Sequence, residues 1–246
     1  MTKGKIKNAL KAEFINGKTT FDWFFLVLGL LMQVGAIIFG IVTDNPDSVI
    51  SMISAIAGII SVVLCAQGKI SFYVFGYVQL FTYVFGVALP NHLWGEVWEN
   101  GFYFITMVYG TFAWLKSYGR RKDNDSAEII AKKLNVAGWI ITMGVLIIGT
   151  TVLTLILNET NDPLPFFDAV STVPAFIAQI LMVVGYREQW LHWCIIDVAS
   201  VVMFILLQNW VMTAMFIFWT LNCIYGWVKW SKSAKYSDWE QGSAIK

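Results

Sequence analysis

The chain has 246 residues, of which 57% are hydrophobic, and its 17 Lys and Arg are nearly balanced by 16 Asp and Glu. This composition is far too apolar for a water-soluble protein, and the connecting segments are too short to hold a soluble catalytic domain. The strand alternation of an outer-membrane barrel is also absent. Cys65, Cys194 and Cys223 fall inside apolar segments, so we expect small apolar residues rather than disulfides or metal ligands.

Eight apolar segments follow one another along the chain, each long enough to cross the ~30 Å hydrocarbon core as a helix. They cover residues 22–43, 49–66, 70–89, 98–117, 136–157, 166–185, 190–207 and 210–229. The sequence thus predicts an all-α integral membrane protein with eight transmembrane helices. Its expected parts are an N-terminal tail (1–20), a first membrane repeat (21–117), a linker (118–135), a second repeat (136–230) and a C-terminal tail (231–246).

Every Lys and Arg falls on one side of this arrangement. The N-terminal tail, the even-numbered connections and the C-terminus hold them, whereas the odd-numbered connections hold acids such as Asp44, Glu96 and Asp162. Short loops rich in Lys and Arg remain in the cytoplasm. The sequence therefore predicts that both termini are cytoplasmic, and this rule explains the basic tails without nucleic-acid binding.

Tryptophans recur at a fixed separation, which indicates an internal duplication. The pairs 116 residues apart are Trp23 with Trp139, Trp94 with Trp210, and Trp114 with Trp230. Trp114 and Trp230 each end a Tyr-Gly-x-x-x-Trp run. Between these pairs the separation drifts to 120 residues, which matches Tyr73 with Trp193. Each repeat has an even number of spans, so the repeats are parallel, and parallel repeats place a substrate site near the midplane at their interface.

One face of the seventh segment carries Trp190, Trp193, Asp197 and Ser200 at helical spacing. Asp197 lies about 10 Å below the inner surface by helical rise. An acid at that depth, with no Lys or Arg in the interior of a span to neutralise it, is by default a functional-site residue.

Further polar and aromatic residues are expected near that depth. From the second half they are Gln179, Asn222 and Tyr225, and from the first half Tyr73, Tyr77, Gln79 and Tyr103. Gln179 and Asn222 fit either hydrogen bonds between helices or ligand contacts. Five tryptophans at span ends fit an interfacial belt, namely Trp23, Trp94, Trp139, Trp210 and Trp230. Trp190 fits that belt better than a binding role, whereas Trp193, one turn deeper, fits binding better.

Sequence signatures of enzymes are missing, including the common metalloprotease, hydrolase and nucleotide-binding motifs. His92 and His192 are expected near opposite surfaces, so together they cannot bind one metal. We therefore expect no catalytic residue, metal or cofactor. The prediction that remains is an aromatic-lined polar pocket in a duplicated helical bundle.

Three runs carry a family resemblance: Arg-Glu-Gln-Trp-Leu-His-Trp at 187–193, Ile-Asp-Val-Ala-Ser at 196–200, and Asn-Cys-Ile-Tyr-Gly-Trp-Val-Lys-Trp at 222–230. With the weaker first-half copy from Tyr103 to Trp114, the chain resembles the PnuC family of nicotinamide riboside transporters over essentially its whole length. The resemblance implies a bacterial inner-membrane protein with two SWEET-like three-helix bundles joined by a linking helix, here preceded by an extra leading helix.

The same resemblance implies facilitated diffusion of nicotinamide riboside by alternating access, with a cytoplasmic kinase trapping the substrate by phosphorylation. The resemblance leaves the oligomeric state open, and a homo-oligomer is one of the alternatives. The chemistry agrees, because aromatic faces attract an organic cation by ~0.5–2 kcal/mol each and a lone buried acid complements a positive ring. Two alternatives remain: a transporter of another vitamin, nucleoside or sugar, and a membrane sensor that binds a ligand without carrying it.

Overall fold

The computed structural model describes residues 11–15, 18–43, 49–90, 92, 94–117, 129–159, 165–206 and 210–243. The described chain is helical apart from turns and short connections, which confirms the all-α prediction. It divides into two compact units, Met1–Ile130 and Ala131–Lys246.

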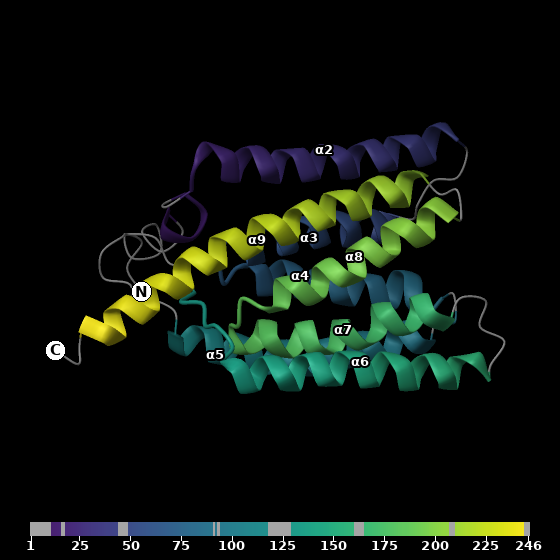
Figure 1. Ribbon diagram of the computed structural model, residues 1–246. Coiled ribbons are helices and arrows are strands. Elements are labelled where there is room, and N and C mark those ends of the chain that lie inside the picture. Colours follow the sequence, from purple (N-terminus) through teal and green to yellow (C-terminus); the bar gives the residue numbers. More distant parts are fainter. Residues whose placement is uncertain are drawn as a thin grey trace. The chain divides into compact units, whose positions relative to one another are not determined.

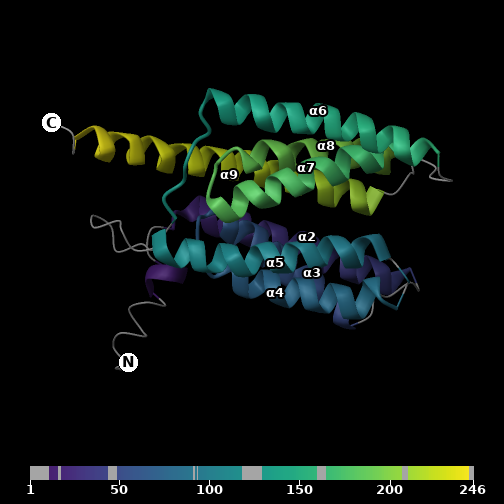
Figure 2. The ribbon, with the colours of Figure 1, turned by 90° about the horizontal axis from the view of Figure 1, so that it is seen from below.

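The first unit is built from α2 (Thr20–Val42), α3 (Val49–Ala66), α4 (Phe72–Tyr83) and α5 (Trp94–Ser117), and α4 continues into a π-helical turn, η1 (Val84–Ala88). Consecutive helices pack on one another, α2 on α3, α3 on α4, and α5 on α4 and η1 (Figure 2). A capping box starts α2, since the Thr19 amide donates to Asp22 Oδ2 (2.8 Å) and the Asp22 amide donates to Thr19 Oγ1 (3.3 Å).

The second unit is built from α6 (Val136–Asn158), α7 (Pro165–Val184), α8 (Gln189–Leu206) and α9 (Trp210–Ser243), which again pack in chain order (Figure 1). Asn135 caps α6, because its Oδ1 accepts from the Gly138 amide at 2.8 Å. No residue of α6 is buried, although the helix is strongly apolar. A helix that is apolar all round and yet uncovered by protein is suited to lipid.

Among the described residues, four helices, α2, α3, α6 and α7, are long and apolar enough to cross a membrane, and Phe72–Ala88 and Gln189–Met203 are shorter apolar helices. Large apolar side chains such as Leu31, Phe85 and Ile140 are exposed on both units. A soluble protein rarely exposes apolar surface on this scale. The protein is therefore a multi-pass membrane protein.

All eight predicted segments coincide with helices, but several ends differ. The last helix continues to Ser243, well beyond the predicted end at residue 229. Hydropathy falls after Trp230, but Lys, Ser, Ala and Glu are compatible with a helix, and no glycine or proline occurs between Trp230 and Gly242. The apolar pattern marks the part of the helix that suits lipid, and backbone propensity extends the helix further.

Each unit contains a glycine in the left-handed region just after a helix. Gly68 (φ 71°) follows α3, and Gly185 (φ 88°) follows α7. Other L-residues would be strained there, so these glycines end the helices. Within the first unit the Gly68 carbonyl accepts from the Ile129 amide (2.9 Å), and within the second the Gly185 carbonyl accepts from the Lys132 amide (2.8 Å). The end of the expected linker is thus hydrogen-bonded, while its residues 118–128 lie outside the described part.

Candidate functional site

The predicted face of α8 is largely covered by protein. Trp190, Asp197 and Ser200 are buried, and Trp193 is half-buried. Their spacing of three, four and three residues keeps them on one side of the helix. The structure therefore presents an acid and two indoles along a single, mainly buried stripe.

The carboxylate of Asp197 meets α9 through a thiol. Cys223 Sγ donates to Asp197 Oδ2 at 3.1 Å, and each residue is only 4% exposed. Within the described residues, no Lys or Arg lies at ion-pair distance from Asp197. Cys223 is a free, buried cysteine, as expected. Its hydrogen bond to the acid was not expected, and it forms because packing of α8 on α9 turns the thiol toward Asp197.

Trp190 is held in place by α9. Its ring lies edge-on to Trp230, with centroids 5.9 Å apart and an interplanar angle of 83°, and it covers Gly226, where a Cβ would come within 2.5 Å of the indole. Trp190 and Trp230 are 4% and 2% exposed. The interfacial-belt interpretation is therefore wrong for both, because the other helix covers rings that hydropathy places at a membrane surface. Trp23, in contrast, is 44% exposed, as a belt residue would be.

The remaining second-unit candidates are also buried. Asn222 and Tyr225 lie on α9 beside Cys223, and Gln179 lies on α7. Lys229, one turn beyond Tyr225, places its Nζ 5.8 Å from the centroid of the Tyr225 ring. The α8–α9 pair thus brings Asp197 to Cys223 and Trp190 to Trp230, while Asn222 and Tyr225 lie on the same helix as Cys223.

In the first unit, Tyr73 and Tyr77 form an aromatic group with α5. The buried Tyr73 ring lies edge-on to Trp114, with centroids 5.5 Å apart at 84°, and 6.5 Å from the Tyr77 ring. The Tyr77 hydroxyl lies 3.1 Å from Thr111 Oγ1. These two tyrosines are therefore neighbours, and their role in a pocket stays a prediction.

Gln79 and Tyr103 lie elsewhere in the first unit. Gln79 faces α3, since a Cβ on Gly58 would lie 3.3 Å from its Cγ. The Tyr103 hydroxyl donates to Glu99 of its own helix. Tyr103 precedes Trp114, the partner of Tyr73, by about 16 Å of helical rise. The expected common depth is therefore wrong for Tyr73 and Tyr103.

The two units share a helix register. Tyr73 meets Trp114 in the first unit as Trp190 meets Trp230 in the second, each edge-on at almost the same angle. This match makes Tyr73 equivalent to Trp190, 117 residues later. The prediction from the 120-residue separation had instead matched Tyr73 with Trp193. Ring contacts locate the equivalence more sharply than spacing, because a short insertion shifts spacing without changing what a side chain touches.

A buried polar cluster at the start of α8 was not predicted. Glu188, just before the helix, and Gln189 and His192, in its first turn, are fully buried. Arg187 Nε donates to Glu188 Oε1 at 3.0 Å. Among the described residues, neither the Gln189 amide nor the His192 ring has a hydrogen-bonding partner. The burial of the His192 ring was not predicted, and its position relative to the membrane surface stays a prediction. The available signal was three polar residues, Glu188, Gln189 and His192, at the start of an apolar helix.

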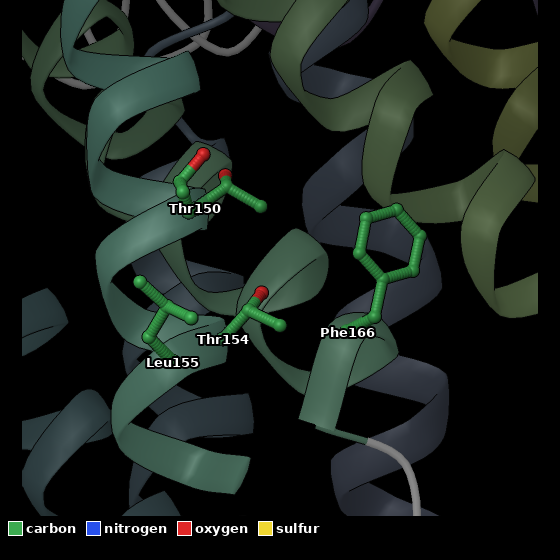
Figure 3. A pocket seen from close by; sticks show the side chains of 5 residues that line it. Thr150, Thr154, Leu155 and Phe166 are labelled. Atoms are coloured by element: carbon green, nitrogen blue, oxygen red, sulfur yellow. The ribbon is translucent and has the colours of Figure 1, made fainter.

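A cavity of about 200 Å³ lies apart from these groups. It is lined by Thr150, Thr151, Thr154, Leu155 and Phe166, from α6 and the start of α7 (Figure 3). None of these residues was a site candidate. Since α6 suits lipid contact, this cavity is a groove on the apolar periphery.

Comparisons with known proteins agree over nearly the whole chain. A family model described as "Nicotinamide mononucleotide transporter" matches residues 48–232. A Haemophilus influenzae protein named nicotinamide riboside transporter PnuC is 33% identical over 228 residues, covering 92% of this chain and 96% of its own. A Neisseria mucosa protein of the same name is 29% identical over 242 residues, covering 95% and 90%.

A solved structure agrees as well. The crystal structure titled as the vitamin B3 transporter PnuC is similar with a TM-score of 0.75 and 28% sequence identity, covering 96% of this chain and 99% of that one. The likeness therefore holds for both sequence and fold.

Proposed function

Because the chain belongs to the nicotinamide mononucleotide transporter family, we propose that it carries nicotinamide riboside across the bacterial inner membrane. The observation that supports this substrate is the buried Asp197, which shares a helix face with Trp190 and Trp193 and lies against α9. A protein of this family is a transporter and not an enzyme.

The chemistry of this face complements the riboside. Nicotinamide riboside has a cationic pyridinium ring, a carboxamide and a ribose. An indole attracts such a cation by ~0.5–2 kcal/mol, and Asp197 supplies a negative charge. The amide of Asn222 and the hydroxyl of Tyr225 suit the carboxamide and the ribose hydroxyls, because each can donate and accept hydrogen bonds.

The mononucleotide named by the family model is the second candidate. It differs by a phosphate, which proteins usually bind through Arg, Lys or backbone amides. Lys229, near the Tyr225 ring, is the observation that favours it. The acid Asp197 opposes an added dianion, so we favour the riboside, the substrate in the names of the curated relatives.

We further propose the predicted architecture: eight spans, two parallel repeats of four, and both termini in the cytoplasm. The matching ring pairs at Trp114 and Trp230, and the left-handed glycines Gly68 and Gly185, support the duplication. The sharing of one pocket by the first-unit and second-unit candidates remains a prediction. Alternating access, facilitated diffusion, a trapping cytoplasmic kinase and a homo-oligomer belong to the same proposal.

Uptake by the purified protein in proteoliposomes tests this function. Radiolabelled nicotinamide riboside should enter until it equilibrates, and unlabelled riboside should compete better than nicotinamide, thiamine or the mononucleotide. Stronger competition by the mononucleotide would select the second candidate. Binding without flux would identify a sensor, and flux of thiamine or another nucleoside alone would overturn the assignment.

A further inference from the structure

The thiol of Cys223 is the polar group that α9 offers to Asp197. Its Sγ lies 3.1 Å from Asp197 Oδ2, a distance suited to an S–H donor and a carboxylate acceptor. Both side chains are buried, so bulk water does not compete for this contact. The S–H group is a weak donor, but the low dielectric of this buried site strengthens its hydrogen bond to the carboxylate.

Packing of these two helices does not require a polar contact at this position, as the equivalent helices of the first unit show. In the shared register, Leu80 takes the place of Asp197 and Met107 takes the place of Cys223, 117 and 116 residues earlier. Leu80 and Met107 are both buried and apolar. Two helices can thus pack in this register without a polar pair, so the acid and thiol of the second unit need a different explanation.

We propose that Cys223 is a positioning residue, which holds the Asp197 carboxylate in the orientation that meets the cationic ring of nicotinamide riboside. This inference rests on the proposed function. No Lys or Arg among the described residues pairs with Asp197, so its orientation depends on contacts of this kind. The thiol occupies Oδ2 and leaves Oδ1 to the ligand.

A fixed carboxylate favours a cation over a neutral molecule of the same shape. The reduced form of nicotinamide riboside has an uncharged dihydropyridine ring and nearly the same size. Cys223 therefore contributes to discrimination between the cationic and the reduced riboside. A general loss of packing would weaken the binding of both ribosides alike. The ratio of the two binding affinities therefore isolates the role of the thiol.

Binding calorimetry on purified full-length protein, with the two ribosides as ligands, provides the test. Cys223→Ala removes the donor and should lower the preference for the cation about 3- to 10-fold, the range for a hydrogen bond to a charged group acting at reduced strength. Cys223→Ser keeps a donor and should restore most of the preference. Cys65→Ala, another buried cysteine to alanine change, should leave it unaltered.

The outcomes distinguish a failure of the positioning role of Cys223 from a failure of the proposed transport function. If Cys223→Ala matches the parent in its preference, or Cys223→Ser falls as far as Cys223→Ala, the positioning role is overturned. In an Asp197→Leu background, Cys223→Ala should have no further effect on the preference; an undiminished effect would also overturn it. Should Cys223→Ala not fold, Cys223→Val is the apolar substitute. If the parent itself neither binds nor carries the riboside, the proposed function fails instead.

Discussion

Gly226 of α9 lies directly under the indole of Trp190 on α8, so close that a Cβ at this glycine would lie 2.5–2.7 Å from three ring carbons. The ring cannot move away freely, because it is buried and Trp230 packs edge-on against it. A Cβ at Gly226 must therefore displace Trp190 or separate the two helices. In the Tyr-Gly-x-x-x-Trp run that ends at Trp230, Gly226 thus leaves room for the Trp190 ring and Trp230 packs against its edge.

Gly226→Ala should destabilise the protein by roughly 1–3 kcal/mol, the usual cost of overpacking, and should weaken riboside binding. Thermal unfolding and calorimetry measure the two effects. Gly144→Ala on α6 is the matched control, because a Cβ there has nothing within 4 Å. Equal behaviour of the two variants would show that the Trp190 position is not constrained by Gly226.

Asp197→Asn should weaken binding of the cationic riboside about tenfold or more, because a charged hydrogen-bonding partner becomes neutral at nearly constant shape. The variant should remain monodisperse, since Asn still accepts from the Cys223 thiol. Calorimetry after size-exclusion chromatography measures this. An unstable variant that keeps its affinity would instead make Asp197 a structural residue.

Trp193→Ala should cost roughly 1–2 kcal/mol of binding free energy, the contribution of one desolvated indole face to a cation. Trp98→Ala on α5, whose ring is 79% exposed, serves as the tryptophan control and should bind like the parent. Parental affinity in the Trp193 variant would assign this half-buried ring to packing.

The proposed orientation can be tested with cysteines in a cysteine-free background. A membrane-impermeant maleimide applied outside sealed cells should label Pro46→Cys and Asn161→Cys but not Arg121→Cys. The positive-inside rule is the reason, because every short connection with Lys or Arg is assigned to the cytoplasm. Labelling at position 121 from outside would reverse the topology.

Equilibration of the riboside should not require an ion gradient. Asp197 is the acid predicted deep inside a span, and no second acid was predicted beside it to form a proton relay. In substrate-loaded vesicles, collapsing the proton and sodium gradients should leave the final distribution unchanged. Concentrative uptake that an uncoupler abolishes, with no kinase present, would establish coupling.

Much of the fold was accessible from local properties of the sequence. Apolar runs predicted where helices lie, because the membrane requires each span to satisfy its own backbone hydrogen bonds. Helical periodicity placed Trp190, Trp193 and Asp197 on one face of α8, because side-chain direction within one helix depends only on spacing. The likeness to known transporters likewise followed from runs within 187–230 that are readable without coordinates.

Relations between helices were not accessible in this way. Cys223 reaches Asp197, and Gly226 underlies Trp190, only because α8 and α9 pack antiparallel in one particular register. Spacing along the chain contains no information on that register. Hydropathy also could not tell a ring covered by lipid from one covered by a neighbouring helix, so Trp190 and Trp230 were assigned to the interface although both are buried. The sequence by itself determined the helices, their apolar character and the acid-bearing face, whereas tertiary packing alone decided which thiol, glycine and ring complete that face.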